Sequence, residues 1–397
     1  MHRLTALLLS GVMLGLMAAC ASAPPSDQRR TPTVPAPTWR AASVPITLEN
    51  ANQIAYLGRL DQEEPAATVF AHAMSPDGLN IAGLTDQNVI GWDLLTGERI
   101  FVNARLTTGV ISYSSDKTEI YGIDSTGDLR VLDATSGSET DRAHGHPAYA
   151  GVYAIATDFD LIALGGTDGT VKVWNMVTRQ SEVTFDAGEQ ITALGFSPDA
   201  SVLATADSDG YIRLWDWATR TQQREWRNEQ LGSTRFTTTR IVFSPDGQQF
   251  ALANDFDVRL GSPTGELSNP LRLETGGRSP MLRYAPDGRY LVMGTNDAGI
   301  ALWTPAAIAL IATLPDTSGD RMDAVFSPDG GMLATTALGR HAALWNISQV
   351  DASGGGRFQF PIENSTILET DWTSDGRLIL LFDANGAIYA WGIPPAP

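Results

Sequence analysis

Short apolar runs separated by tight turns repeat through residues 47–397. A unit opens with a turn such as Ser-Pro-Asp-Gly at 244–247, where proline presets φ, aspartate bonds its own backbone and glycine accepts a positive φ. A run of small and branched residues follows, as at 201–206, and then a second turn containing Asp-Gly, as at 208–210. The next apolar run ends in a large aromatic residue, as at 171–174. The pattern predicts strands joined by hairpins, and therefore an all-β fold.

Two markers recur eight times in the same phase. The turn motif centres on Asp77, Asp116, Asp158, Asp199, Asp246, Asp287, Asp329 and Asp375. The second marker follows 14 to 16 residues later and is Trp92, Leu132, Trp174, Trp215, Leu260, Trp303, Trp345 or Trp391. A period of roughly 40 to 45 residues is typical of four-stranded propeller blades, which must stack because one blade cannot bury both of its faces. We therefore assign a structural role to the six tryptophans of the second marker.

The segments 242–247 (Val-Phe-Ser-Pro-Asp-Gly) and 212–216 (Ile-Arg-Leu-Trp-Asp) resemble the WD-repeat β-propeller family. The resemblance covers residues 47–397 and implies four-stranded antiparallel blades. Repeats of that family often carry a Gly-His pair whose histidine joins a hydrogen-bonded set with an aspartate, a Ser or Thr, and the tryptophan. Only Gly145-His146 matches this pair, so we expect apolar packing to supply most of the stability.

The two ends of the repeat array indicate how the ring closes. The last unit stops shortly after Trp391 and lacks an outermost strand, whereas residues 54–60 precede the first unit and form a spare strand. We predict that this N-terminal strand completes the last blade. The result would be an eight-bladed β-propeller with 32 strands and no unprotected edge.

The N-terminus reads as an export signal. A basic start is followed by an apolar stretch, residues 4–19, that is shorter than the roughly 20 residues of a membrane span. Leu-Met-Ala-Ala-Cys at 16–20 resembles the bacterial lipoprotein lipobox, which implies lipid attachment at Cys20; the alternative is an ordinary signal peptide with an incidental cysteine. We assign residues 1–19 to a lipoprotein signal peptide, 20–46 to a Pro/Ala/Ser/Thr-rich tether and 47–397 to the propeller.

Charge and cysteine content narrow the range of partners. The formal net charge is −18, and loss of residues 1–19 would remove Arg3 and no acidic residue. So acidic a chain repels polyanions, which argues against nucleic acid as a partner. Cys20 is the only cysteine in the sequence, so an intramolecular disulfide and a cysteine-based zinc site are excluded. The expected location is the outer face of the cytoplasmic membrane or the outer membrane, facing the periplasm or the cell exterior.

Catalytic and cofactor motifs are weak. His144 and His146 could bind a metal loosely, but a solvated loop with a remnant Gly-His pair is the better interpretation, because zinc sites need three or four ligands. Asp207-Ser208-Asp209-Gly210 resembles half a calcium loop and lacks the distal glutamate. We therefore predict a protein that is not an enzyme and uses no metal or cofactor.

Longer connections follow Trp215 and Trp345, and long loops on a rigid scaffold often carry function. The first connection suggests a partner-binding patch, because Trp and Arg are enriched in binding hot spots. Its candidate residues are Trp226, Arg235, Phe236 and Arg240. The alternative is that Trp226 covers the edge of the fourth blade while the arginines are solvated.

These observations favour a non-catalytic scaffold for protein–protein interactions, anchored on the extracytoplasmic side of a bacterial membrane, with envelope or secreted proteins as partners. Two alternatives stay open. One is a ligand or glycan sensor that binds through the central channel. The other is a hydrolase or lyase with dispersed carboxylates.

Overall fold

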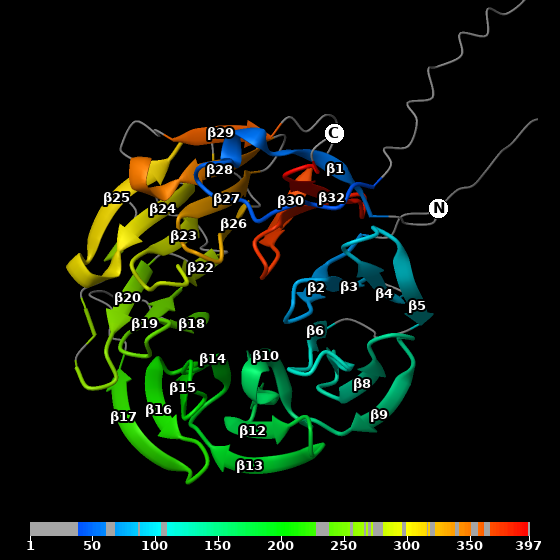
Figure 1. Ribbon diagram of the computed structural model, residues 1–397. Coiled ribbons are helices and arrows are strands. Elements are labelled where there is room, and N and C mark those ends of the chain that lie inside the picture. Colours follow the sequence, from blue (N-terminus) through cyan, green and yellow to red (C-terminus); the bar gives the residue numbers. More distant parts are fainter. Residues whose placement is uncertain are drawn as a thin grey trace, which may run out of the picture. The chain divides into compact units, whose positions relative to one another are not determined.

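The computed structural model describes residues 39–60, 68–85, 88–104, 109–227, 238–254, 257–265, 267–268, 271–272, 281–295, 299–315, 317, 322–337, 341–350, 356–360 and 366–395. The compact unit Pro37–Pro397 contains eight four-stranded sheets, which form a ring of blades (Figure 1). The predicted eight-bladed propeller is therefore confirmed. Helical structure in the described residues is limited to the 3-10 turns η1 (Ala51–Gln53), η2 (Thr157–Phe159), η3 (Pro305–Ala307) and η4 (Ile347–Gln349).

The first four blades follow the chain without interruption. Their strands are β2 (Ala71–Met74), β3 (Asn80–Leu84), β4 (Asn88–Asp93) and β5 (Arg99–Ala104); β6 (Gly109–Tyr113), β7 (Glu119–Asp124), β8 (Leu129–Asp133) and β9 (Glu139–Ala143); β10 (Tyr149–Ala156), β11 (Leu161–Gly166), β12 (Thr170–Asn175) and β13 (Gln180–Asp186); and β14 (Ile191–Phe196), β15 (Val202–Asp207), β16 (Tyr211–Asp216) and β17 (Thr221–Arg227).

The last four blades end with one that combines both ends of the chain. Their strands are β18 (Arg240–Phe243), β19 (Phe250–Ala253), β20 (Asp257–Gly261) and β21 (Leu271–Arg272); β22 (Met281–Tyr284), β23 (Leu291–Thr295), β24 (Gly299–Thr304) and β25 (Ala309–Leu314); β26 (Met322–Phe326), β27 (Met332–Ala337), β28 (His341–Asn346) and β29 (Arg357–Phe360); and β30 (Ile367–Trp372), β31 (Leu378–Asp383), β32 (Ile388–Gly392) and β1 (Ala55–Arg59).

We call the strands of each blade a to d from the centre outward. The a–b and c–d turns then lie on one face of the ring, the a–b face, and the b–c turns and d–a connections lie on the other, the b–c face. Adjacent a–b turns touch: Ser374 Oγ donates to Pro76 O at 3.0 Å, and Lys117 Nζ contacts Asp77 Oδ2 at 2.9 Å. The inner strands therefore all end on the a–b face.

Ring closure follows the predicted route. The blue strand β1 lies beside the red strand β32 in Figure 1, and the two pair antiparallel, with Ala55 opposite Gly392 and Arg59 opposite Tyr389. A bulge interrupts the register between Tyr56 and Gly58. Because the N-terminal strand is the outermost strand of the eighth blade, both ends of the described chain are held in one sheet.

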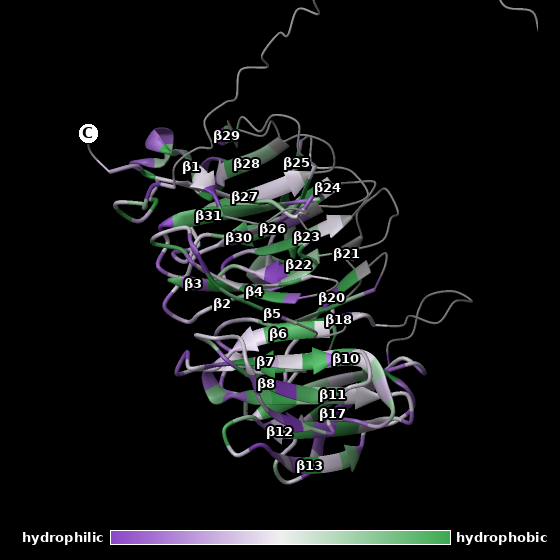
Figure 2. Cartoon of the chain, turned by 90° about the vertical axis from the view of Figure 1, so that its right-hand side faces the viewer, coloured by the Kyte–Doolittle hydropathy of each residue, from purple (hydrophilic) through white to green (hydrophobic). Residues whose placement is uncertain are grey.

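The core lies between the blades. Eight clusters of buried apolar side chains are present in the described residues, and each joins two neighbouring blades. Seen from the side, apolar residues follow the strands and hydrophilic residues gather at the turns (Figure 2). All six marker tryptophans are buried, as are Leu132 and Leu260, which replace tryptophan in the second and fifth repeats. Every blade thus depends on both neighbours for burial of its faces.

The marker tryptophans do not share one hydrogen-bond partner. Trp215 Nε1 donates to Thr205 Oγ1 at 3.1 Å, and Trp345 Nε1 donates to Thr335 Oγ1 at 2.9 Å. Trp174 Nε1 instead donates to the Gly145 carbonyl at 3.2 Å. The polar set of the resembled repeats is therefore only partly present, whereas burial of the side chain is common to all eight repeats.

The stretch 39–46, which falls within the range assigned to the tether, packs on the a–b face. Trp39 Nε1 donates to the Leu95 carbonyl at 3.0 Å, on the c–d turn of the first blade. The Ile46 amide donates to the Gly376 carbonyl at 2.8 Å, on the a–b turn of the eighth blade. The described chain therefore joins the ring on this face.

Candidate functional site

The centre of the ring contains a cavity of about 680 Å³. Its wall is formed by the inner strands of every blade but the fourth and by residues next to them. Many of the wall residues are apolar, among them Phe70, Val110, Ile155, Leu282 and Leu368. The cavity is large enough for a small organic ligand or a peptide side chain.

A set of charged residues, which we call the channel belt, surrounds this cavity. It consists of His72, Arg240, Arg283, Asp323, Glu369 and Asp371. All but Asp371 lie within the first three residues of an inner strand. Arg283 and Asp371 each lie one residue before the a–b end of their strands, so the belt spans the length of the inner strands along the channel wall.

The histidine of the belt joins the first blade to the eighth. His72 Nε2 lies 3.0 Å from Asp371 Oδ2, and His72 Nδ1 lies 3.4 Å from Glu369 Oε2. The imidazole also stacks on Phe382, with ring centroids 4.1 Å apart. Burial alone would lower the pKa of His72, but the two carboxylates outweigh it and raise that pKa to about 9. His72 is therefore a cation at neutral pH and bridges the two blades at which the ring closes.

A second ion pair joins the sixth and seventh blades. Arg283 Nη2 contacts Asp323 Oδ1 at 3.1 Å, and the other oxygen of Asp323 accepts a hydrogen bond from the Thr370 amide at 3.1 Å. Burial raises the pKa of Asp323, and the charge of Arg283 opposes that rise. Each carboxylate of the belt is thus in contact with a cation of the belt.

Arg240 differs from the other cations of the belt. Its side chain lines the cavity, and no carboxylate among the described residues lies within ion-pair distance of it. Burial in the channel lowers the pKa of Arg240, and the like charge of Arg283 lowers it further. Tyr153 of the third blade also lines the cavity and interacts electrostatically with Arg240. Asp323 partly opposes the lowering of the Arg240 pKa from beyond ion-pair distance, so the guanidinium of Arg240 has no direct carboxylate contact among the described residues.

The opposite face of the ring is built from repeated turns. In six blades a Ser or Thr hydroxyl donates to the aspartate two residues later, with distances of 2.6 to 2.8 Å. The third repeat differs, because Asp160, with φ of 50°, occupies the left-handed position and accepts from Ser115 of the second blade. The a–b aspartates thus serve the turns that shape the blades.

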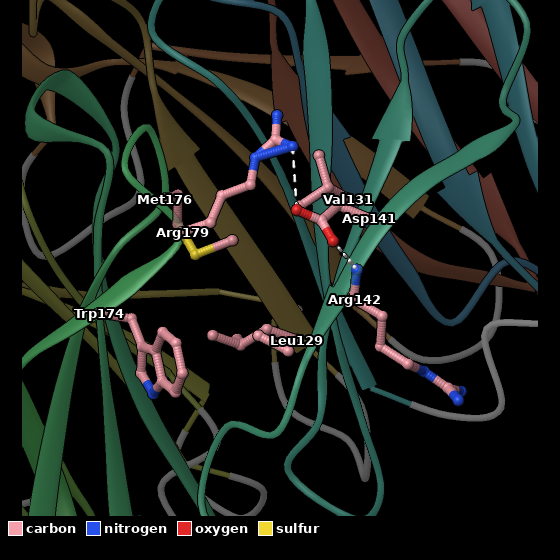
Figure 3. Close-up of a pocket in the computed structure, with 8 residues that line it drawn as sticks. Leu129, Val131, Asp141, Arg142, Trp174, Met176 and Arg179 are labelled. Carbon is pink, nitrogen blue, oxygen red and sulfur yellow. Dashed lines mark hydrogen bonds and ion pairs between the residues drawn. The ribbon is translucent and has the colours of Figure 1, made fainter.

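A smaller pocket lies between the second and third blades (Figure 3). Asp141 lies between Arg179, whose Nη1 is 3.2 Å from Asp141 Oδ2, and the backbone amide of Arg142. Trp174 and Leu129 complete the wall. The cavity measures about 10 Å³, which is hardly more than one water molecule needs, so this seam is not a ligand site.

The two described residues of the predicted partner-binding patch, Trp226 and Arg240, lie apart in the fold. Trp226 on β17 is only 8% exposed and packs on Phe250, with ring centroids 5.5 Å apart. It covers the edge of the fourth blade, as the alternative interpretation held, because its indole fills the apolar space between the fourth and fifth blades. Arg240 instead lies on an innermost strand and faces the channel. Arg235, Phe236 and Cys20 lie outside the described residues.

The two loop histidines have separate surroundings. The side chain of His144 is 95% exposed and contacts Asp128, whereas His146 is buried and its Nε2 lies 3.0 Å from Thr170 Oγ1. Within the described part of the chain, no group of three or more His, Cys, Asp or Glu side chains is placed to hold a metal ion. No helix there is long and apolar enough to cross a membrane. Asp207 begins the segment that resembles half a calcium loop. It caps its own turn, because its Oδ1 accepts hydrogen bonds from the backbone amides of Asp209 and Tyr211.

Sequence reasoning found Arg240 but missed the rest of the belt. The missed residues carry one local signal, which is a charge inside an otherwise apolar first strand. Examples are Ala-His-Ala-Met at 71–74 and Met-Leu-Arg-Tyr at 281–284. The pairing of these charges cannot be predicted in the same way, because it depends on which blades become neighbours across the channel.

Comparisons with known proteins agree with this architecture. Residues 137–175 and 180–216 match the model of the family described as WD domain, G-beta repeat. An uncharacterised WD repeat-containing protein of Synechocystis sp. is 33% identical over 25% of this chain and 29% of its own length. Protein ROOT INITIATION DEFECTIVE 3 of Arabidopsis thaliana is 20% identical over 53% of this chain and 51% of its own length. The chain thus spans about half or less of these curated relatives.

Two solved structures share the fold. The computationally designed Ika8 protein superimposes with a TM-score of 0.66 at 18% identity, covering 84% of this chain and 99% of that one. The C-terminal WD40 domain of Sif2 superimposes with a TM-score of 0.65 at 13% identity, covering 86% and 99%. These similarities agree with the propeller fold of eight four-stranded blades, and the match to the WD domain model covers two of the chain's repeats.

Proposed function

We propose that this protein is a non-catalytic scaffold for protein–protein interactions, held by lipid at Cys20 on the extracytoplasmic side of a bacterial membrane. The observation that carries the proposal is the closed WD-type ring, a fold typical of interaction scaffolds. The sequence of residues 16–20, which resembles a lipobox, supports the anchor. Envelope or secreted proteins are the partners expected at that location.

The b–c face is the proposed binding surface. The stretch 39–46, with which the described chain begins, joins the ring on the a–b face. The b–c face is on the opposite side, and it surrounds the opening of the channel that contains the channel belt, whose charges differ from blade to blade. A surface without repetition gives a partner a single way to dock, whereas eight similar turns offer nearly equivalent positions.

In-cell photo-crosslinking tests this surface. A photoreactive amino acid replaces Phe70, which is 39% exposed beside the belt, or Val177, which is 66% exposed on a c–d turn of the other face. We expect defined protein adducts from position 70 and few from position 177. Equal adducts at both positions, or adducts only at 177, would contradict the proposal.

The anchor has a separate test. Cys20→Ala should move the protein from the membrane pellet to the soluble fraction, because the lipidated residue is lost. Met17→Leu is the matched control, since it keeps the cysteine and brings the preceding residues closer to the lipobox pattern. Membrane association of the Cys20→Ala variant would show that the anchor lies elsewhere.

A second candidate is a sensor that binds a ligand through the channel. The central cavity of about 680 Å³, with its unpaired guanidinium, favours it. This role does not need a stable protein partner, so crosslinking and direct binding experiments separate the two functions.

A further inference from the structure

We propose that the central cavity binds an organic carboxylate, which is held by Arg240 on the channel wall between the third and sixth blades. The proposal rests on the second candidate function and is independent of the scaffold role. It concerns the chemical class of the ligand. A carboxylate could come from a small molecule or from an acidic side chain or C-terminus of a protein, and both would present the same group.

The unpaired guanidinium is the first argument. The carboxylates of the belt are already engaged, Asp323 by Arg283 at 3.1 Å and Asp371 by His72 at 3.0 Å. Arg240 is left without a carboxylate among the described residues while its side chain lines the cavity. A guanidinium presents a planar fork of N–H donors that fits a carboxylate in a bidentate way. An entering carboxylate would therefore supply the partner that this part of the wall lacks.

Charge balance favours a monoanion. His72 with Glu369 and Asp371 leaves one excess negative charge at the seam of the first and eighth blades, whereas Arg240 with Arg283 and Asp323 leaves one excess positive charge at this part of the wall. A carboxylate would neutralise that excess, whereas a phosphate dianion would place surplus negative charge beside Asp323. The whole chain already carries a formal net charge of −18, which further disfavours a dianion.

The rest of the wall indicates the remainder of the ligand. Most of the exposed wall is polar, and Phe70, Val110, Ile155 and Leu368 add apolar patches to it. Tyr153, which is 40% exposed and interacts electrostatically with Arg240, places a phenol nearby as a further hydrogen-bond donor. A carboxylate that carries both a polar group and a small apolar body matches this combination.

Ligand-observed NMR with purified protein tests the proposal. The probes are benzoate and N-acetylphenylalanine, the second standing for the C-terminus of a chain, and their controls are benzamide and N-acetylphenylalaninamide. We expect at least one carboxylate to bind while its amide does not. Arg240→Gln should weaken that binding by about 10- to 100-fold, the range for hydrogen bonds to charged groups.

Two further variants make the result interpretable. Arg142→Gln removes an exposed arginine on the outer strand β9 and should leave binding unchanged. Arg240→Lys keeps the charge but loses the planar fork, and should bind more weakly than the wild type. Binding of benzoate alone points to a small-molecule source, and binding of N-acetylphenylalanine alone points to a chain terminus.

Three results would contradict the proposal. The proposal fails if neither carboxylate binds, if the amides bind equally well, or if folded Arg240→Gln binds like the wild type. A thermal unfolding curve confirms that each variant is folded. Crosslinking at position 70 is unaffected by this outcome, so failure of the carboxylate site and failure of the scaffold role remain distinguishable.

Discussion

The a–b face of the ring and the wall of the central channel are built on different principles. At the a–b face one turn is used repeatedly, with a hydroxyl donating to an aspartate two residues away in six blades. Along the channel wall the inner strands carry charges that differ from blade to blade and pair across blade boundaries. The comparison teaches that repeated polar groups stabilise the blades individually. Polar groups that are not repeated join particular blades or remain available to a ligand.

The largest expected effect tests the repeated part of the fold. Trp345 is fully buried between the sixth and seventh blades. Trp345→Ala should lower the free energy of unfolding by about 3–5 kcal/mol, because it leaves a cavity. Chemical denaturation measures the loss, and Leu310→Ala, at a side chain 45% exposed on the outer strand β25, is the control. A loss below about 1 kcal/mol would mean that Trp345 contributes little to the packing between the sixth and seventh blades.

A smaller effect is expected at the seam between the first and eighth blades. Folding raises the pKa of His72 from its ordinary value of 6.5 to about 9. Its contribution to stability, up to about 3 kcal/mol, is therefore complete below pH 6.5 and is lost as the pH rises through about 9. His72→Gln should remove this part of the pH dependence.

Denaturation between about pH 6 and 10 measures this contribution. His144→Gln is the matched control, because the His144 side chain is 95% exposed beside Asp128. If the stabilities of wild type and His72→Gln fall equally between about pH 7 and 10, the His72 pair does not hold the closing blades together.

The turn hydroxyl should have a still smaller effect. Ser327 Oγ donates to Asp329 Oδ1 at 2.6 Å and accepts the Met332 amide at 2.9 Å. Ser327→Ala leaves a buried amide without this partner, so we expect a loss of about 1–2 kcal/mol in denaturation experiments. The exposed hydroxyl of Ser201, bonded to Asp199, is the control, and Ser201→Ala should cost less than half as much. An equal loss of stability in both variants would show that burial of the turn hydroxyl does not determine its contribution.

The smallest effect on stability is expected at Arg240. Because Arg240 has no carboxylate partner among the described residues and lies near Arg283, Arg240→Gln should change the free energy of unfolding by no more than about 0.5 kcal/mol. Arg283→Gln is the contrasting variant, since it leaves Asp323 without its cation and should cost about 1–3 kcal/mol. A large loss in Arg240→Gln would show that this arginine is part of the fold rather than free for a ligand.

The sequence by itself determined the blade number, the turn positions and the closing strand. Each depends on signals that lie within a few residues of one another, such as Ser-Pro-Asp-Gly at 244–247, or on the strand 54–60 left over after eight units are counted. Local turn chemistry and short apolar runs bounded by turns act the same way in every unit, so they can be read from the chain.

Only the tertiary structure decided which charges meet. His72 and Asp371 are 299 residues apart, and they pair because the ring places the first blade next to the eighth. Trp226 and Arg240 are close in sequence, yet one is buried on an outermost strand and the other faces the channel from an innermost strand. The physical reason is that the direction in which a side chain points is set by its strand's place in the blade, and its neighbours are set by how blades pack. No short-range pattern encodes that packing.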